Sequence, residues 1–226
     1  MANLNQLFLQ HVVASFDKQL SLGDIIGSAD WHADMENQTV TFGSQHCFKM
    51  QVIGTESSSS NTWLWAWANQ GRIPAAALCA SEELHALGRQ NNIPELTQNM
   101  LPITEEINGH NLMAIATGIC NGDAYYRGPY DGGAVFMLIR DQDFPRETVD
   151  PVIRIPTVFT QAIMAFSISD HKVAFRHYVE YYHGRIEETD DTILAEFDDG
   201  SRVEAKFEPP HRLTSISARC GPLTTT

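Results

Sequence analysis

The chain has 226 residues, of which 43% are hydrophobic and 19% charged, and this is the composition of an ordinary folded protein. Its 28 Asp and Glu residues outnumber 15 Lys and Arg residues, so the formal net charge at pH 7 is -13. Nucleic acids and anionic membranes are both polyanionic and attract clustered basic residues, so this charge argues against either as a partner.

The length predicts one domain, residues 1–226, with a well-formed core. Four cysteines lie far apart and form no C-x-x-C pair, so we expect reduced thiols and neither a zinc site nor a disulfide framework. The N-terminus has the pattern of an amphipathic helix and not of a secretory signal, and no segment has the apolar length that spans a bilayer. These features predict a cytoplasmic protein without membrane contact.

The first elements along the chain are a helix and four strands. Apolar residues recur at helical spacing over residues 4–20, and we expect this helix to end near Gly23. Strands with alternating hydrophobicity follow, joined by short turns, over residues 31–35, 39–43, 47–54 and 62–69. Four short-linked strands predict an antiparallel meander.

The fourth strand contains three of the chain's four tryptophans. In a strand, Trp63, Trp65 and Trp67 share one face, and the residues between them, which are also apolar, share the other. A strand with two apolar faces belongs inside a covered sheet. We therefore expect these indoles to be core, with only one edge reaching a groove or partner surface; the alternatives are a stacking surface for a ligand and a patch that meets another protein.

Helices are predicted for most of the chain between residues 75 and 183. The first should end at Gly88 and the second is a short one opened by Pro94. A buried helix is followed by an Asn-Gly stop and then by a buried strand, and two further helices are separated by a possible capping box, Ser167-x-x-Asp170. The expected ranges are 75–88 and 111–120 for helices, 134–139 for the strand, and 157–167 and 170–183 for the last helices.

The end of the chain predicts a β-hairpin. A two-residue loop would set an apolar row opposite a charged row, and that register cannot bury one face. A three-residue loop, residues 198–200 with glycine in the left-handed position, instead pairs Ala195 with Val203 and Ile193 with Ala205. The fold predicted for the chain is therefore α+β, with an antiparallel N-terminal meander, helices packed on the sheet and a C-terminal β-hairpin.

The segment Y-Y-R-G-P-Y-D-G-G, residues 125–133, is predicted to be a loop and supplies the candidate binding residues. Arg127 could clamp a carboxylate or phosphate, while Tyr126, Tyr130 and Asp131 could line a pocket mouth. The segment is not a phosphate-binding P-loop, because the lysine and hydroxyl residues are missing. The competing interpretation is a tight helix-to-strand connection anchored by its tyrosines.

Motifs for catalysis or metal binding are weak. His177 and His183 point to nearly opposite sides of one predicted helix, so they cannot share a metal ion unaided. The acidic run over residues 187–199 lacks the spacing of a calcium loop and is typical of a solvated turn. Cys120 fits a buried structural cysteine better than a nucleophile. The sequence therefore predicts no catalytic residue, metal or cofactor.

Three stretches together resemble a bacterial family of domains of unknown function. They are the tryptophan strand with its preceding turn, the tyrosine-rich segment and the terminal hairpin, residues 53–69, 125–133 and 197–207. The resemblance spans most of the chain and implies a bacterial cytoplasmic protein. It implies no activity and no catalytic residues.

Two functions are compatible with these features. The first is a noncatalytic protein that binds another protein, of a regulatory or toxin-neutralising type, and it rests on the acidic composition and the lack of catalytic motifs. The second is a small-molecule-binding protein or enzyme with its pocket at residues 125–133. The sequence favours the first and does not define an oligomeric state.

Overall fold

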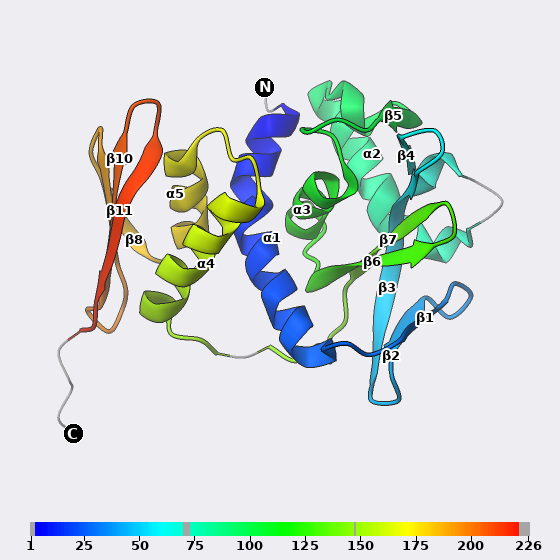
Figure 1. Ribbon diagram of the computed structural model, residues 1–226, viewed down its shortest axis with the longest axis horizontal. Coiled ribbons are helices and arrows are strands. Elements are labelled where there is room, and N and C mark those ends of the chain that lie inside the picture. The colour runs from blue at the N-terminus through cyan, green and yellow to red at the C-terminus, as the bar shows by residue number, and fades with distance from the viewer. Residues whose placement is uncertain (1–2, 70–72, 147, 222–226) are drawn as a thin grey trace. The chain divides into compact units, whose positions relative to one another are not determined.

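The computed structural model describes residues 3–69, 73–146 and 148–221 (Figure 1). The chain is α+β, as predicted. Its contacts group into two compact units, Met1–Phe8 with Asp17–Pro145 and Leu9–Phe16 with Arg146–Thr226. The expectation of a single domain stays a prediction, because this grouping does not test whether either unit folds alone.

The first helix, α1, spans Leu4–Ile26 and is longer than predicted. Asn3 and Gln6 form a reciprocal capping box that fixes its start, with both hydrogen bonds at 2.9 Å. The predicted end near Gly23 is wrong, since the helix continues to Gly27, where φ is +51°. A glycine inside a helix weakens it without stopping it, and Ile25 and Ile26 continue the apolar face beyond Gly23 by packing against a core cluster.

A seven-stranded sheet forms the centre of the first unit (Figure 1). The neighbours β1 to β5 follow chain order, which confirms the predicted antiparallel meander, and β7 pairs with β3 while β6 pairs with β7. The strands are β1 Trp31–Asp34, β2 Thr39–Phe42, β3 His46–Ser57, β4 Thr62–Trp65, β5 Met100–Pro102, β6 Ala124–Tyr130 and β7 Gly133–Ile139.

The tryptophan segment is buried, as predicted, but its strand is shorter than expected. Strand β4 ends at Trp65, and a 3-10 turn, η1, covers Ala66–Ala68. The reason lies in the backbone of Trp67, whose N–H donates to the Ser81 hydroxyl at 3.0 Å and so does not join a strand ladder. Trp63, Trp65 and Trp67 are 0%, 1% and 8% exposed. The prediction that the indoles belong to the core is confirmed.

Two helices of the first unit pack on the sheet (Figure 1). Helix α2 spans Cys79–Asn91 after the short turn η2, Ala75–Ala77, and ends at left-handed Asn92, so the predicted stop at Gly88 is wrong. Gly88 serves packing instead, since an added Cβ would lie 2.5 Å from the Leu96 Cβ. The predicted buried helix is confirmed as α3, Gly109–Ile119, and the short one as the 3-10 turn η3, Pro94–Leu96.

Residues 125–133 form a β-hairpin, so the prediction of a loop is wrong. Strand β6 pairs with β7 through Tyr130 and Gly133 around a two-residue turn. Gly132 permits that turn with φ of +86°, and Pro129 is tolerated because β6 is an edge strand. Glycine and proline residues indicated a loop in the sequence, but in the structure the glycines form a tight turn and the proline lies in an edge strand of the sheet.

The second unit contains two helices and a four-stranded antiparallel sheet ordered β11-β10-β9-β8. The hairpin of β9 and β10 has the predicted three-residue loop and register, with Ala195 opposite Val203 and Ile193 opposite Ala205. Gly200 is left-handed, with φ of +77°. The elements are α4 Pro151–Ala165, α5 His171–Tyr181, β8 Arg185–Glu188, β9 Thr192–Glu196, β10 Arg202–Glu208 and β11 Arg212–Arg219.

Helix α4 starts earlier than predicted, whereas α5 starts where it was predicted but has a different cap. Helix α4 begins six residues early, at Pro151, because Asp150 caps it and proline is favoured at a first helical position. Helix α5 is capped by Asp170, whose carboxylate accepts from the Val173 N–H at 2.9 Å. The proposed capping box starting at Ser167 is therefore wrong. In the described ranges, none of the helices has the length and apolarity to cross a membrane.

Candidate functional site

The four residues predicted to bind a ligand do not share one face of β6. Side chains alternate along a strand, so Tyr126 and Tyr130 lie on one side and Arg127 on the other, while Asp131 is in the turn. Tyr126 packs against Phe42, with ring centroids 4.8 Å apart, and its partial burial raises the pKa of its phenol. Tyr130 is 50% exposed. A binding role for these residues stays a prediction.

Arg127 instead lies near a carboxylate that holds the start of α3. Its Nε is 3.8 Å from Oε2 of Glu56, and its guanidinium carbon lies 5.9 Å from the centre of the Phe136 ring. The other oxygen of Glu56, Oε1, accepts from the N–H of Gly109 at 2.7 Å. Glu56 therefore satisfies one N–H at the positive end of a helix and faces a cation at the same time.

A histidine and a tyrosine lie beside this pair. Nδ1 of His110 is 2.9 Å from the Tyr125 hydroxyl, and Tyr125 is 4% exposed. Burial raises the pKa of Tyr125, so the phenol stays protonated in its hydrogen bond with His110. Burial also lowers the pKa of His110; the Glu56 carboxylate opposes this shift and Arg127 adds to it. His110 is thus mainly neutral at pH 7.

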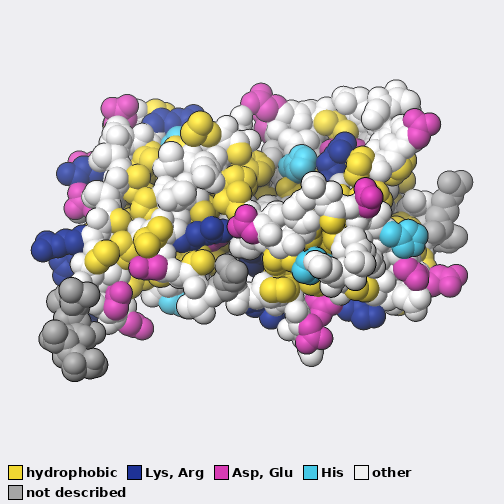
Figure 2. All heavy atoms as spheres, turned by 60° about the horizontal axis from the view of Figure 1, so that its bottom comes forward, with side chains coloured by type: hydrophobic (Ala, Val, Ile, Leu, Met, Phe, Trp, Pro, Cys, Tyr) yellow, Lys and Arg dark blue, Asp and Glu magenta, His cyan; other side chains and the backbone are white. Residues whose placement is uncertain are grey.

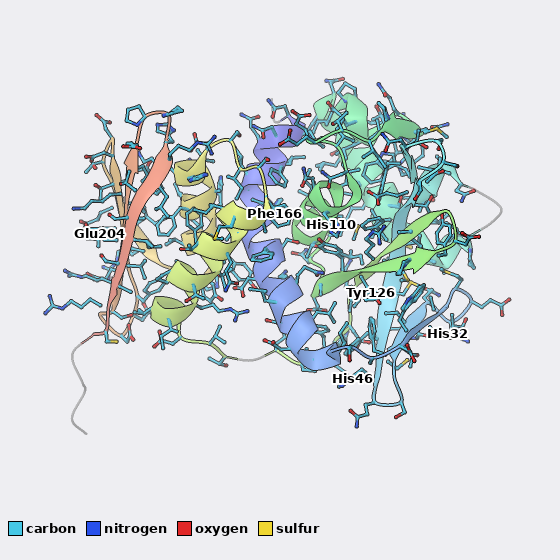
Figure 3. All side chains as sticks on the ribbon, viewed as in Figure 1. His32, His46, His110, Tyr126, Phe166 and Glu204 are labelled. Carbon is cyan, nitrogen blue, oxygen red and sulfur yellow. The ribbon has the colours of Figure 1, made fainter. Side chains whose placement is uncertain are left out.

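We call Glu56, His110, Tyr125 and Arg127 the α3 cluster. Figure 3 shows its His110 on α3, whereas Tyr126 lies toward the β1–β2 hairpin. The sequence analysis found Arg127 but missed Glu56 and His110, which come from β3 and α3. The Glu56 carboxylate accepts from the Gly109 N–H, and His110 hydrogen-bonds to the Tyr125 hydroxyl, so the cluster fastens α3 to β3 and β6.

Arg127→Ala should change the melting temperature little, because a half-exposed ion pair with a 3.8 Å separation contributes about 1 kcal/mol or less. If Arg127 does bind an anion, the substitution should also abolish any stabilisation by added inorganic phosphate. Thermal unfolding with and without phosphate measures both effects, with Arg89→Ala on the exposed surface of α2 as the control. A large loss of stability without phosphate would show that Arg127 is structural.

A pocket lies elsewhere in the first unit. Its volume is about 550 Å³, and we call it the Trp67 pocket. The described residues that line it come from η1, from α2 and from the bend before β5, and they are Trp67, Ala68, Glu82, His85 and Asn99.

An aromatic pair forms one part of this pocket. The rings of Trp67 and His85 stack with centroids 3.9 Å apart and planes 3° from parallel. Trp67 is buried beneath and His85 is partly exposed. The indole Nε1 of Trp67 is also buried and finds no hydrogen-bond partner in the described part of the chain. The pocket therefore contains a flat aromatic stack, and the indole N–H of that stack has no acceptor among the described residues.

The local fold accounts for the position of each lining side chain. The 3-10 turn directs Trp67 to α2, where the Ser81 hydroxyl accepts from its backbone N–H and itself donates to Ile53 O at 3.3 Å. Glu82 and His85 are three residues apart on α2, so they project from the same side of that helix. The backbone oxygen of Asn99 accepts from Trp65 N at 3.2 Å, which fixes the bend.

Sequence analysis expected one tryptophan edge at a groove, and Trp67 fits that prediction. It missed Glu82, His85 and Asn99. The i, i+3 spacing of Glu82 and His85 was the available signal, but such pairs are common on solvated helix faces. Among the described residues, no group of three or more His, Cys, Asp or Glu side chains could hold a metal ion.

Fold and site together define an α+β protein with a meander sheet, two covering helices and an aromatic-lined pocket. The chain belongs to the DUF6882 family, a family of unknown function, which matches residues 5–142. No curated protein and no solved structure matches it significantly. The matched segment contains both the α3 cluster and the Trp67 pocket and ends before α4.

Proposed function

We propose that the protein binds a small molecule in the Trp67 pocket. The observation that carries the proposal is a pocket of about 550 Å³ lined by an aromatic stack and a few polar side chains. Small-molecule sites have volumes of about 300–1,000 Å³ and combine apolar or aromatic walls with a few orienting polar groups. The pocket lies within the segment that defines the family. This site replaces residues 125–133 as the location of the pocket in our proposal.

A protein partner, of a regulatory or toxin-neutralising type, is the second candidate. Acidic side chains are scattered over the face shown in Figure 2 and do not form one patch there for a basic partner. The observation that favours a partner is on α4, where Ile153 and Met164 are 68% and 82% exposed. They lie about three turns apart on one helix face. The exposed Thr157, Thr160 and Gln161 of the same helix are uncharged.

A fragment screen by two-dimensional amide NMR tests the proposal. Fragments that bind the pocket should shift the indole N–H resonance of Trp67, and His85→Ala should weaken them by removing half of the stack. His32→Ala is the matched control, because His32 is an exposed histidine on β1 of the same unit. Fragments that leave the Trp67 resonance unchanged, or that bind His85→Ala equally well, would contradict the proposal.

We place this function in the cytoplasm. All four cysteines are free thiols, and Cys47, Cys79 and Cys220 are exposed, which suits a reducing compartment.

A further inference from the structure

We propose, on the basis of the function proposed above, that the Trp67 pocket selects a planar organic cation, such as an amidinium or guanidinium group. Three features of the lining support this ligand class: its charge, its aromatic surface and its amide.

The charge of the lining is negative. Glu82 supplies a carboxylate, and neither Lys nor Arg is among the described lining residues. Arg89, further along α2, does not line the pocket. The net charge of -13 adds a general attraction for cations and a repulsion for anions. An anionic ligand would be repelled by the Glu82 carboxylate, and the described lining has no Lys or Arg side chain to offset that repulsion.

The aromatic stack favours a flat ligand. His85 stacks on the Trp67 indole with centroids 3.9 Å apart and is itself partly exposed, so a flat ligand that stacked on the outer face of the imidazole would add a third layer. A delocalised planar cation stacks on such a surface and is attracted by the electron density of the rings. A bulky tetrahedral ammonium would contact less of it.

Asn99 adds directional recognition. Asn99 and Glu82 both line the pocket, and a carboxamide oxygen and a carboxylate can each accept hydrogen bonds from a ligand. A planar cation with several N–H donors can therefore use both acceptors and the stacking surface, whereas a neutral amide of the same shape has fewer donors and no charge to offer the carboxylate. Charge-assisted hydrogen bonds are the stronger kind, so the carboxylate should dominate the selectivity.

Three probes of nearly the same shape separate these contributions: benzamidinium, neutral benzamide and anionic benzoate. Isothermal titration should give the order benzamidinium, then benzamide, then benzoate, with about a tenfold step between the first two. Glu82→Gln should remove most of that step, because it should weaken the binding of benzamidinium far more than the binding of benzamide. Glu83→Gln is the control, because Glu83 is the adjacent exposed acid on α2 and does not line the pocket.

Equal affinity for the three probes, tighter binding of benzoate, or benzamidinium affinity unchanged by Glu82→Gln would overturn the inference. An equal loss in Glu83→Gln would also overturn it, because the selectivity would then come from the net charge and not from the pocket. If none of the three probes binds, the inference about a planar cation is rejected, but the proposed function is not. The proposed function is rejected by a different result, a fragment screen in which no fragment shifts the Trp67 resonance.

Discussion

Gly54→Ala should destabilise the first unit by about 3 kcal/mol, the upper part of the usual range for overpacking. An added Cβ would lie 2.2 Å from Cζ2 of Trp63 and 2.8 Å from the backbone oxygen of Leu64. Trp63 cannot move aside easily, since it is 0% exposed and packs against Trp65 and Phe136 with ring centroids 5.4 and 5.2 Å away. The clash must therefore separate β3 from β4.

Chemical denaturation followed by tryptophan fluorescence measures this loss, since all four tryptophans belong to the first unit. Gly23→Ala is the control: nothing described lies within 4 Å of its added Cβ, so the helix should gain up to about 1 kcal/mol. In the double variant with Trp63→Phe, which removes the clashing ring atoms, Gly54→Ala should cost less. An unchanged unfolding midpoint for Gly54→Ala would contradict the close packing.

The parts of this fold that could be predicted are those in which the pattern of apolar and polar residues along a short segment decides which face is buried. The register of the β9–β10 hairpin followed from a single requirement, that one face be buried, and the structure has that register. The burial of the tryptophans followed from the two apolar faces of their segment. Strand β5, with three residues, and β11, which is mostly exposed, carry too little alternation to be recognised.

The residues of both sites come from distant segments, and this is why most of them were missed. Glu56 meets the N–H of Gly109 across 53 positions, and no local pattern marks such a pair. Asn99 joins the Trp67 pocket from a bend whose position depends on β4 and β5. Pro129 and Gly132 indicated a loop, because their roles at a sheet edge and in a tight turn depend on pairing with β7.

Glu56→Ala should cost about 1–3 kcal/mol, because it leaves the N–H of Gly109, a buried residue, without its acceptor. Glu56→Gln keeps an acceptor oxygen on a side chain of the same length, so it should lose less stability than Glu56→Ala. Tryptophan fluorescence during denaturation measures both variants, and hydrogen exchange at Gly109 reports the local bond. Glu36→Ala, in an exposed turn of the same unit, should stay within about 0.5 kcal/mol of the parent.

Comparison with Arg127→Ala then separates the two contacts of Glu56. If the helix bond dominates, Glu56→Ala loses far more stability than Arg127→Ala, and the double variant loses little beyond Glu56→Ala alone, because the 3.8 Å ion pair contributes little. Full stability of Glu56→Ala would show instead that water replaces the carboxylate at α3. The Gly109 N–H and Arg127 would then be free of their internal acceptor, and the α3 cluster would become a candidate anion-binding site.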